Sequence, residues 1–159
     1  MKQILSDELE LVFATEIATQ AHLNQVDKAG VDYIKHPIAV ASFCNSIKAK
    51  TIAMLHDVLE DTKITKEDLL LKGISEEVID AVVCLTHLPN ETIEIYFKRI
   101  ASNMLATEVK FADMKHNSDI ERLSNKFNKN EAEKTQYKYL KRTELLKSII
   151  LSKQNQESK

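Results

Sequence analysis

Residues 49–62 read AKTIAMLHDVLEDT, and this stretch decides the fold because it is mostly apolar yet carries a cluster of polar groups. Ile52, Leu55 and Leu59 follow the three- and four-residue spacing of one helix face, which predicts a helix over 49–59 with that face toward the core. The polar groups project from the other side of such a helix: His56, Asp57, Glu60 and Asp61. Three carboxylates beside an imidazole repel one another unless a cation or solvent neutralises them. The stretch therefore indicates either a metal site or an acidic helix end exposed to water.

Helical spacing continues on both sides of this stretch. The chain has 2 Gly and 2 Pro in 159 residues, so it lacks the residues that hairpins and tight turns need. Periodicity and capping signals predict further helices over 5–21, 38–47, 65–73, 75–86, 91–102, 105–123 and 130–152. His36 is expected at the N-cap of the 38–47 helix, with Pro37 in the first turn. The sequence thus predicts an all-α bundle of about eight helices, in a single domain over 1–159 that ends in a polar tail at 152–159.

Charge and hydropathy exclude several classes of function. Lys and Arg number 22 against 24 Asp and Glu, and a net charge of −2 is unlike that of a dedicated nucleic-acid binder. No run approaches eighteen apolar residues, and the first residues lack the basic and apolar segments of a signal peptide. We therefore expect a cytoplasmic protein with neither a nucleic acid nor a membrane as partner.

A second polar cluster lies in the predicted 105–123 helix. Lys110, Asp113 and Asn117 share one face, at i, i+3 and i+7. Aspartate is a poor choice in the middle of a helix, because its short side chain competes for backbone hydrogen bonds. The cluster is either functional or an exposed Asp113 paired with Lys110.

The polar clusters and their surroundings resemble a known family. His36, His56-Asp57 and Asp113 have the order and separation of the four metal ligands of the HD phosphohydrolase superfamily. Over about residues 10–123, the sequence around them is most similar to the hydrolase domain of the RelA/SpoT family and to small stand-alone alarmone hydrolases. The matching boxes are Ala21-His22-x-x-Gln25, Lys28-x-Gly30, Tyr33-Ile34-x-His36-Pro37, His56-Asp57-Val58-x-Glu60-Asp61-Thr62 and Val109-Lys110-x-Ala112-Asp113-x-x-x-Asn117.

The resemblance implies an HD-type helical bundle with a divalent metal, manganese in the family, held by the four ligands. Two imidazoles and two carboxylates suit such an ion, and a bound cation lowers the pKa of its water and polarises a phosphoryl group. Glu60 and Asp61 match the pair that would orient the attacking water and shuttle protons.

The resemblance also implies residues that bind the substrate. Lys28 and Lys110 are the candidate phosphate-binding cations, and Asn117 matches a position near the nucleoside. Asp27 occupies the place of an arginine that stacks on guanine in the family. Its carboxylate is expected to accept hydrogen bonds from a base edge or to pair with Lys28.

The expected function is that of a metal-dependent nucleotide phosphohydrolase. The leading case is guanosine 3′,5′-bis(diphosphate) 3′-pyrophosphohydrolase, with a small-molecule nucleotide as the partner. One alternative is an HD-type phosphatase on another nucleotide, such as a nucleoside monophosphate or NADPH. Another is a catalytically silent nucleotide-binding or partner-binding module. The sequence does not predict the oligomeric state.

Overall fold

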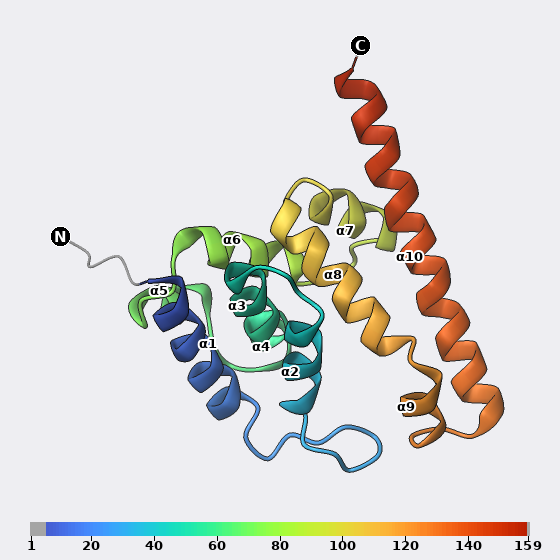
Figure 1. The fold of residues 1–159 in the computed structure, drawn as a ribbon, viewed down its shortest axis with the longest axis horizontal. Coiled ribbons are helices and arrows are strands. Elements are labelled where there is room, and N and C mark those ends of the chain that lie inside the picture. Colours follow the sequence, from blue (N-terminus) through green and yellow to red (C-terminus); the bar gives the residue numbers. More distant parts are fainter. Residues whose placement is uncertain (1–5, 159) are drawn as a thin grey trace.

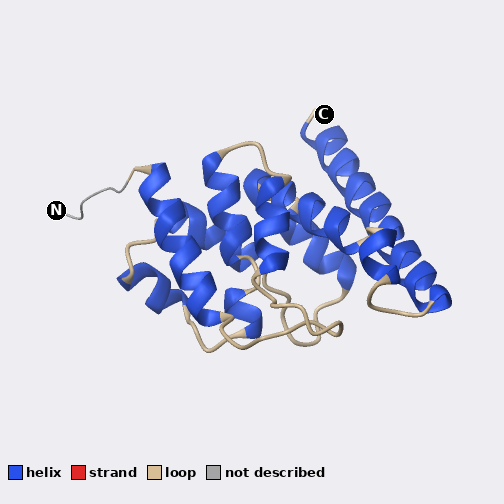
Figure 2. Cartoon of the chain, turned by 60° about the horizontal axis from the view of Figure 1, so that its bottom comes forward, coloured by secondary structure: helices blue, strands red, loops and turns tan. Residues whose placement is uncertain are grey.

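Helices supply the regular structure of residues 6–158, the part of the chain that the computed structural model describes (Figure 1, Figure 2). The all-α prediction is confirmed, with ten helices and no named strand in this range. Their bounds are α1 Asp7–Ala21, α2 Lys35–Ser42, α3 Ile47–Leu55, α4 Val58–Asp61, α5 Lys66–Leu71, α6 Glu76–Leu85, α7 Ile93–Ile100, α8 Met104–Asn117, α9 Ile120–Ser124 and α10 Lys129–Glu157.

Side-chain caps define where most helices begin. A Ser, Thr, Asn or Asp side chain accepts a hydrogen bond from the first turn of eight of the helices, which satisfies a backbone N–H that would otherwise have no partner. The two helices without such a cap are α2 and α4. These two carry or directly follow His36 and Asp57, so the irregular helix starts lie where the chemistry-bearing residues are.

Helix α3 forms the centre of the core. Every residue from Thr51 to Leu55 is buried, and α3 packs against α1, α2, α6 and α8. A helix that is buried all round needs neighbours on every side, and these four supply them. Because α2 and α8 both lie against α3, side chains from three parts of the chain far apart in sequence can meet at its carboxyl end.

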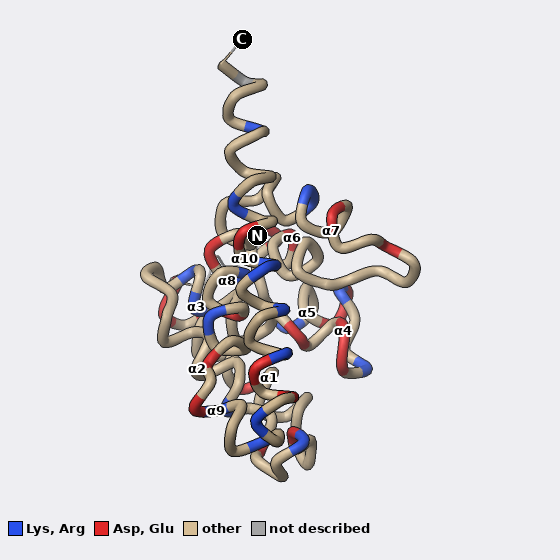
Figure 3. Tube along the Cα trace, turned by 90° about the vertical axis from the view of Figure 1, so that its right-hand side faces the viewer, with Lys and Arg blue, Asp and Glu red and all other residues tan. Residues whose placement is uncertain are grey.

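Helix α10 lies along one side of the molecule, against α7, α8 and α9 (Figure 1). Leu146 is fully buried there, whereas Leu151 is 60% exposed. The last turns extend beyond the other helices, as Figure 3 also shows. The helix continues to Glu157, past the end expected near 152, so most of the polar tail is helical in the described residues.

Three of the predicted helices have other boundaries in the structure. The predicted 49–59 helix is divided between α3 and α4, with His56 and Asp57 in the break. Asp119 caps the new helix α9, which divides the predicted 105–123 helix. The predicted 38–47 helix ends at Ser42, because Ser46 caps the next one.

The prediction that His36 is an N-cap is wrong. Helix α2 begins two residues earlier than such a cap implies, at Lys35, and its N-cap position is Ile34. The N–H of Lys35 already donates to the carbonyl of Asp32, and the N–H of His36 to that of Tyr33, so the chain turns before it reaches His36. Pro37 remains in the first turn, as predicted.

None of the helices of residues 6–158 has both the length and the apolar character that crossing a bilayer would require.

Candidate metal centre

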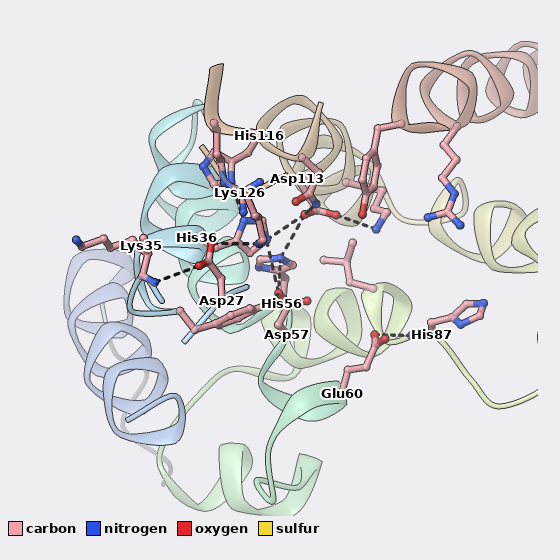
Figure 4. A pocket seen from close by; sticks show the side chains of 18 of the residues that line it. Asp27, Lys35, His36, His56, Asp57, Glu60, His87, Asp113, His116 and Lys126 are labelled. Carbon is pink, nitrogen blue, oxygen red and sulfur yellow. Dashed lines mark hydrogen bonds and ion pairs between the residues drawn. The ribbon is translucent and has the colours of Figure 1, made fainter. Parts of the chain in front are cut away.

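Three segments bring together the four residues that the sequence singled out as metal ligands. His36 comes from α2, His56 and Asp57 from the break between α3 and α4, and Asp113 from α8. Their side chains point toward one another in Figure 4. His56 and Asp113 are buried, whereas His36 and Asp57 are partly exposed, so the cluster is reached from one side only.

The donor atoms are spaced as ligands around one ion would be. Nε2 of His36 lies 3.2 Å from Oδ1 of Asp113 and 3.6 Å from Oδ2 of Asp57. Nε2 of His56 lies 3.1 Å from Oδ2 of Asp57 and 3.7 Å from Oδ1 of Asp113. Ligands at roughly 2.0–2.2 Å from a common centre stand about this far from one another. The donor atoms of His36, His56 and Asp57 all lie within 4.8 Å of one another.

The hydrogen bonds of His56 leave one ring nitrogen free for a ligand. Its Nδ1 is 2.7 Å from the carbonyl oxygen of Ala53, which can only accept, so Nδ1 carries the proton. The other nitrogen, Nε2, is buried and has no hydrogen-bond partner in the described residues, as is also the case for Nε2 of His22. An unsatisfied buried nitrogen is costly, and a cation between His56 and the carboxylates would satisfy it. The donor set therefore fits a divalent metal.

Electrostatics keep both carboxylates of the cluster ionised. Burial acts to raise the pKa of Asp113, but Lys110 and the two histidines outweigh it and hold that pKa well below its usual range. Burial likewise opposes ionisation of Asp57, and the neighbouring rings of His56 and His36 overcome it, so the pKa of Asp57 is also lowered. Both groups are thus anionic oxygen donors at neutral pH.

Neighbouring side chains hold Asp113 in place. Lys110 donates to Oδ2 at 2.8 Å, and Asn117 donates through Nδ2 to Oδ1 at 2.6 Å. Lys110 is mostly buried in this ion pair, and its Nζ also lies 5.3 Å from the centre of the Tyr96 ring. The expected pairing of Asp113 with Lys110 is present, but the expectation that such an Asp113 is exposed is wrong, because its side chain is 7% exposed. The substrate-binding roles of Lys110 and Asn117 stay predictions.

Tyr33 belongs to one of the matching sequence boxes, but no role in the site was predicted for it. Its hydroxyl donates to Oδ2 of Asp57 at 2.5 Å and lies 3.4 Å from Oδ2 of Asp61. Burial, followed by the Asp57 charge, raises the pKa of Tyr33, so the phenol stays a donor. The Tyr33 hydroxyl thereby links the metal cluster to one member of the expected proton-handling pair.

Glu60 lies in the same cavity, apart from the four donors and beside His87 (Figure 4). The cavity has a volume of about 620 Å³. Oε2 of Glu60 accepts the backbone N–H of His87 at 3.0 Å, which leaves Oε1 free to face the cavity. Asp61 does not line the cavity. Burial and the charge of Asp57 raise the pKa of Asp61. The predicted catalytic roles of both acids stay predictions, and Glu60 has the better position.

Asp27 lines the cavity, but its carboxylate is already engaged by protein groups. Oδ1 accepts the backbone N–H groups of Ala29 and Val31, and Oδ2 forms an ion pair with Lys126 at 3.1 Å. Burial opposes these contacts, yet together they lower the pKa of Asp27. The carboxylate pairs with Lys126 and not with Lys28, whose Nζ lies 5.4 Å from the centre of the Phe127 ring.

The carboxyl-terminal part of the chain contributes cations to the cavity: Arg122, Lys126 and Arg142. A smaller hollow adjoins it and shares Asn117, Arg122, Lys126 and Tyr139 with it. Within residues 6–158, four cations of this hollow form no ion pair with an acid: Lys28, Arg122, Lys134 and Lys138. Helix α10 also reaches the cavity, through Tyr139 and Arg142. Their i, i+3 spacing, which puts both on one helix face, is the sequence signal that could have indicated this.

The fold and the cluster define a class: an all-helical, HD-like bundle with His and Asp donors gathered at the end of its central helix. A solved structure described as a metazoan ortholog of SpoT that hydrolyzes ppGpp has this fold. The likeness covers 89% of this chain and 85% of that one, with a TM-score of 0.69 at 21% sequence identity.

Sequence comparison finds similar segments in bacterial enzymes. The chain is 38% identical over 119 residues to the guanosine-3′,5′-bis(diphosphate) 3′-pyrophosphohydrolase of Borreliella burgdorferi, which is 65% of this chain and 18% of that protein. It is 36% identical over 115 residues to the Haemophilus influenzae protein of the same name, covering 64% and 17%. The Spiroplasma citri protein of that name is 30% identical over 134 residues, covering 74% and 18%.

These similarities confirm the resemblance to RelA/SpoT-type hydrolase domains that the motifs predict. The chain spans less than a fifth of the length of these bacterial relatives. No protein-family model matches the chain.

Proposed function

We propose that this chain is a metal-dependent nucleotide phosphohydrolase whose leading substrate is guanosine 3′,5′-bis(diphosphate). The observation that carries the proposal is the convergence of two imidazoles and two ionised carboxylates in a cavity of about 620 Å³. The names of the three bacterial relatives described above, each a 3′-pyrophosphohydrolase of this nucleotide, suggest the substrate. In the reaction water adds across the bond between the 3′-oxygen and phosphorus, and the products are GDP and pyrophosphate.

The four donors His36, His56, Asp57 and Asp113 would hold a divalent ion, for which we propose Mn²⁺. When bound, such an ion supplies Lewis-acid polarisation of the phosphoryl group and a lower pKa for water. The protein keeps the donors ready for the ion: Tyr33 holds Asp57 and Lys110 holds Asp113, so little side-chain order has to be gained on binding.

Glu60 is the proposed general base. Its carboxylate faces the cavity without being one of the close cluster atoms, and the backbone of His87 fixes one oxygen. The free oxygen can accept a proton from the water that attacks phosphorus. Asp61, whose Oδ2 lies 3.4 Å from the Tyr33 hydroxyl, is the proposed group that passes a proton on to solvent.

The cations of the adjoining hollow supply the charge that a polyanionic substrate requires. Asp57, Asp113 and Glu60 carry three negative charges in the cavity, which Lys110 and one divalent ion balance, so the phosphates of a nucleotide need further cations. Lys28, Arg122 and two further lysines of the adjoining hollow form no ion pair within residues 6–158, and they outnumber Glu131, an acid that also lines this hollow. A nucleotide with phosphates at two positions fits this separation of charge, one group at the metal and the other at the cations.

A hydrolysis screen with product identification tests the proposal. The purified chain with Mn²⁺ is incubated with guanosine 3′,5′-bis(diphosphate), NADPH and a nucleoside monophosphate, and ³¹P NMR identifies the phosphate released. We expect pyrophosphate and GDP from the first substrate, and no turnover by the control variant Asp57→Asn.

The other outcomes of the screen would overturn the proposal in different ways. Orthophosphate released only from NADPH or the monophosphate would identify a phosphatase with another substrate. Metal binding without turnover on any nucleotide would favour a silent binding module.

A further inference from the structure

His116 makes an unusual contact with one of the candidate metal ligands. It lies on α8, three residues after Asp113, and its Nδ1 is 2.7 Å from Nδ1 of His36. The two ring centres are 4.9 Å apart and the ring planes differ by 29°. The distance between the ring centres is about the sum of the Nδ1–Nδ1 distance and the radii of the two rings, so both Nδ1 atoms lie close to the line that joins the centres. The rings therefore meet nitrogen to nitrogen in a nearly in-line hydrogen bond, and their faces do not overlap.

The chemistry of two imidazoles decides which nitrogen carries the proton. Between two neutral rings, one Nδ1 must donate and the other must accept. Nε2 of His36 faces the carboxylates of Asp57 and Asp113, where a cation would lie. For that Nε2 to offer its lone pair, the proton of His36 must be on Nδ1, so Nδ1 of His116 is the acceptor.

We propose that His116 is a positioning residue of the metal centre, whose Nδ1 accepts the N–H of His36 and so fixes both the tautomer and the ring orientation in which His36 can bind a metal. The second histidine of the centre is held differently. Nδ1 of His56 donates to the backbone carbonyl of Ala53, an acceptor that no side-chain substitution removes. Of the two histidines, His36 alone therefore depends on another side chain to fix its tautomer.

The inference rests on the metal centre of the proposed function, and its test needs no substrate. Mn²⁺ affinity is measured by calorimetry for the wild type and for the matched variants His116→Asn and His116→Leu. Asn and Leu have nearly the same shape, but only the Asn amide oxygen can accept from Nδ1 of His36. Because outer partners of metal-binding histidines are worth roughly 10–100-fold in affinity, we expect His116→Leu to bind Mn²⁺ that much more weakly and His116→Asn to stay within a few-fold of wild type.

Two controls separate positioning from folding. Thermal unfolding of each metal-free variant reports whether the fold persists, and His116→Ala takes the place of the Leu variant if that one does not unfold cooperatively. His87→Leu changes another histidine of the same cavity, one whose side chain contacts Tyr96 rather than a metal donor, and should leave Mn²⁺ affinity unchanged.

Wild-type affinity in His116→Leu, or equal losses in the Asn and Leu variants, would overturn the proposal. A wild type that binds no Mn²⁺ would overturn both this inference and the proposed function. The predicted affinity series without hydrolysis of any nucleotide would support His116 as a positioning residue and contradict the proposed function alone.

Discussion

The buried carboxylate of Asp113 interacts with four other side chains. One oxygen faces both imidazoles of the cluster and accepts from Asn117, and the other is paired with Lys110. A buried carboxylate needs this many partners because its desolvation would otherwise favour the neutral acid. The spacing Lys110, Asp113, Asn117 on one helix face made this cluster visible in the sequence. The contact of Tyr33 with Asp57 was not visible, because it joins residues on separate elements.

At Glu60 the account predicts a separation of metal binding from turnover. Glu60→Gln preserves the shape and the acceptor for the His87 N–H but removes the group that takes a proton from water. We expect turnover to fall by about 10²–10⁴-fold, the range of a general base, with Mn²⁺ affinity unchanged. Turnover and calorimetry are measured on the same preparation. Near-normal turnover would remove Glu60 from the mechanism, and loss of metal would make it a ligand.

At the scale of elements, the break between α3 and α4 was the part of the fold that periodicity could not predict. The apolar pattern runs through 49–59 without interruption, so it favours one helix. The His56 ring instead donates to the carbonyl of Ala53, the acceptor that an unbroken helix would use for the N–H of Asp57. His56, a candidate metal ligand, thus also ends helix α3. Periodicity does not predict this replacement of a backbone donor by a side-chain donor, because it depends on the tertiary contacts of the His56 ring.

The loop after α1 and the connection from α9 to α10 are joined by the Asp27–Lys126 ion pair. Both side chains are mostly buried, at 16% and 13% exposed, and they lie at the edge of the cavity. A double-mutant cycle of Asp27→Asn and Lys126→Met, measured by urea unfolding, should give a coupling energy of about 1 kcal/mol. Asn keeps the oxygen that accepts from Ala29 and Val31, so the loop turn survives. Additive effects of the two changes would show that the pair does not join these segments.

The end of α6 and the start of α7 are held by Arg99 and Glu91. Arg99 donates to both oxygens of Glu91 and to carbonyls at the end of α6, and it thereby fixes the segment that carries His87. The Arg99 hydrogen bonds, partly opposed by desolvation, lower the pKa of Glu91. A lowered carboxyl pKa stabilises the fold above the unfolded value, about 4.3, and this contribution is lost as the pH falls through the folded value.

Glu91→Gln should therefore cost about 1–3 kcal/mol in free energy of unfolding at pH 7, and progressively less as the pH falls below about 4. Urea unfolding of both proteins across this range measures the difference. An equal difference at pH 7 and pH 3 would contradict the ionic role of Glu91.

At the scale of the whole molecule, the helix content and the core were predictable because the burial of α3 is encoded in its apolar residues, above all the run from Ile52 to Leu55. The resemblance to RelA/SpoT-type domains located the four donors. Lys28 was the one cation of the adjoining hollow that the sequence singled out. Arg122, Lys134 and Lys138 were not predictable, because they lie on separate segments and meet only after α10 packs against α8 and α9. The assignment of residues 1–159 to one domain stays a prediction.

Metal binding should stabilise the whole fold, since the donors come from α2, the α3–α4 break and α8. At a free Mn²⁺ concentration about 100 times Kd, mass action adds about 2.7 kcal/mol to the free energy of unfolding. For a chain of this size that corresponds to an increase in Tm of several degrees. Thermal scans with Mn²⁺ and with a chelator measure the shift. Asp57→Asn is the control, and a shift of equal size in that variant would place the ion elsewhere.

The central claim is that His36, His56, Asp57 and Asp113 hold one divalent ion. An anomalous-scattering map from crystals of the Mn²⁺-loaded protein, recorded at the manganese edge, tests it most directly. The account predicts a single strong peak inside the cavity, roughly 2.0–2.3 Å from both histidine Nε2 atoms and from an oxygen of each aspartate. A peak outside this cluster, or any of the four side chains more than about 6 Å from the ion, would contradict it.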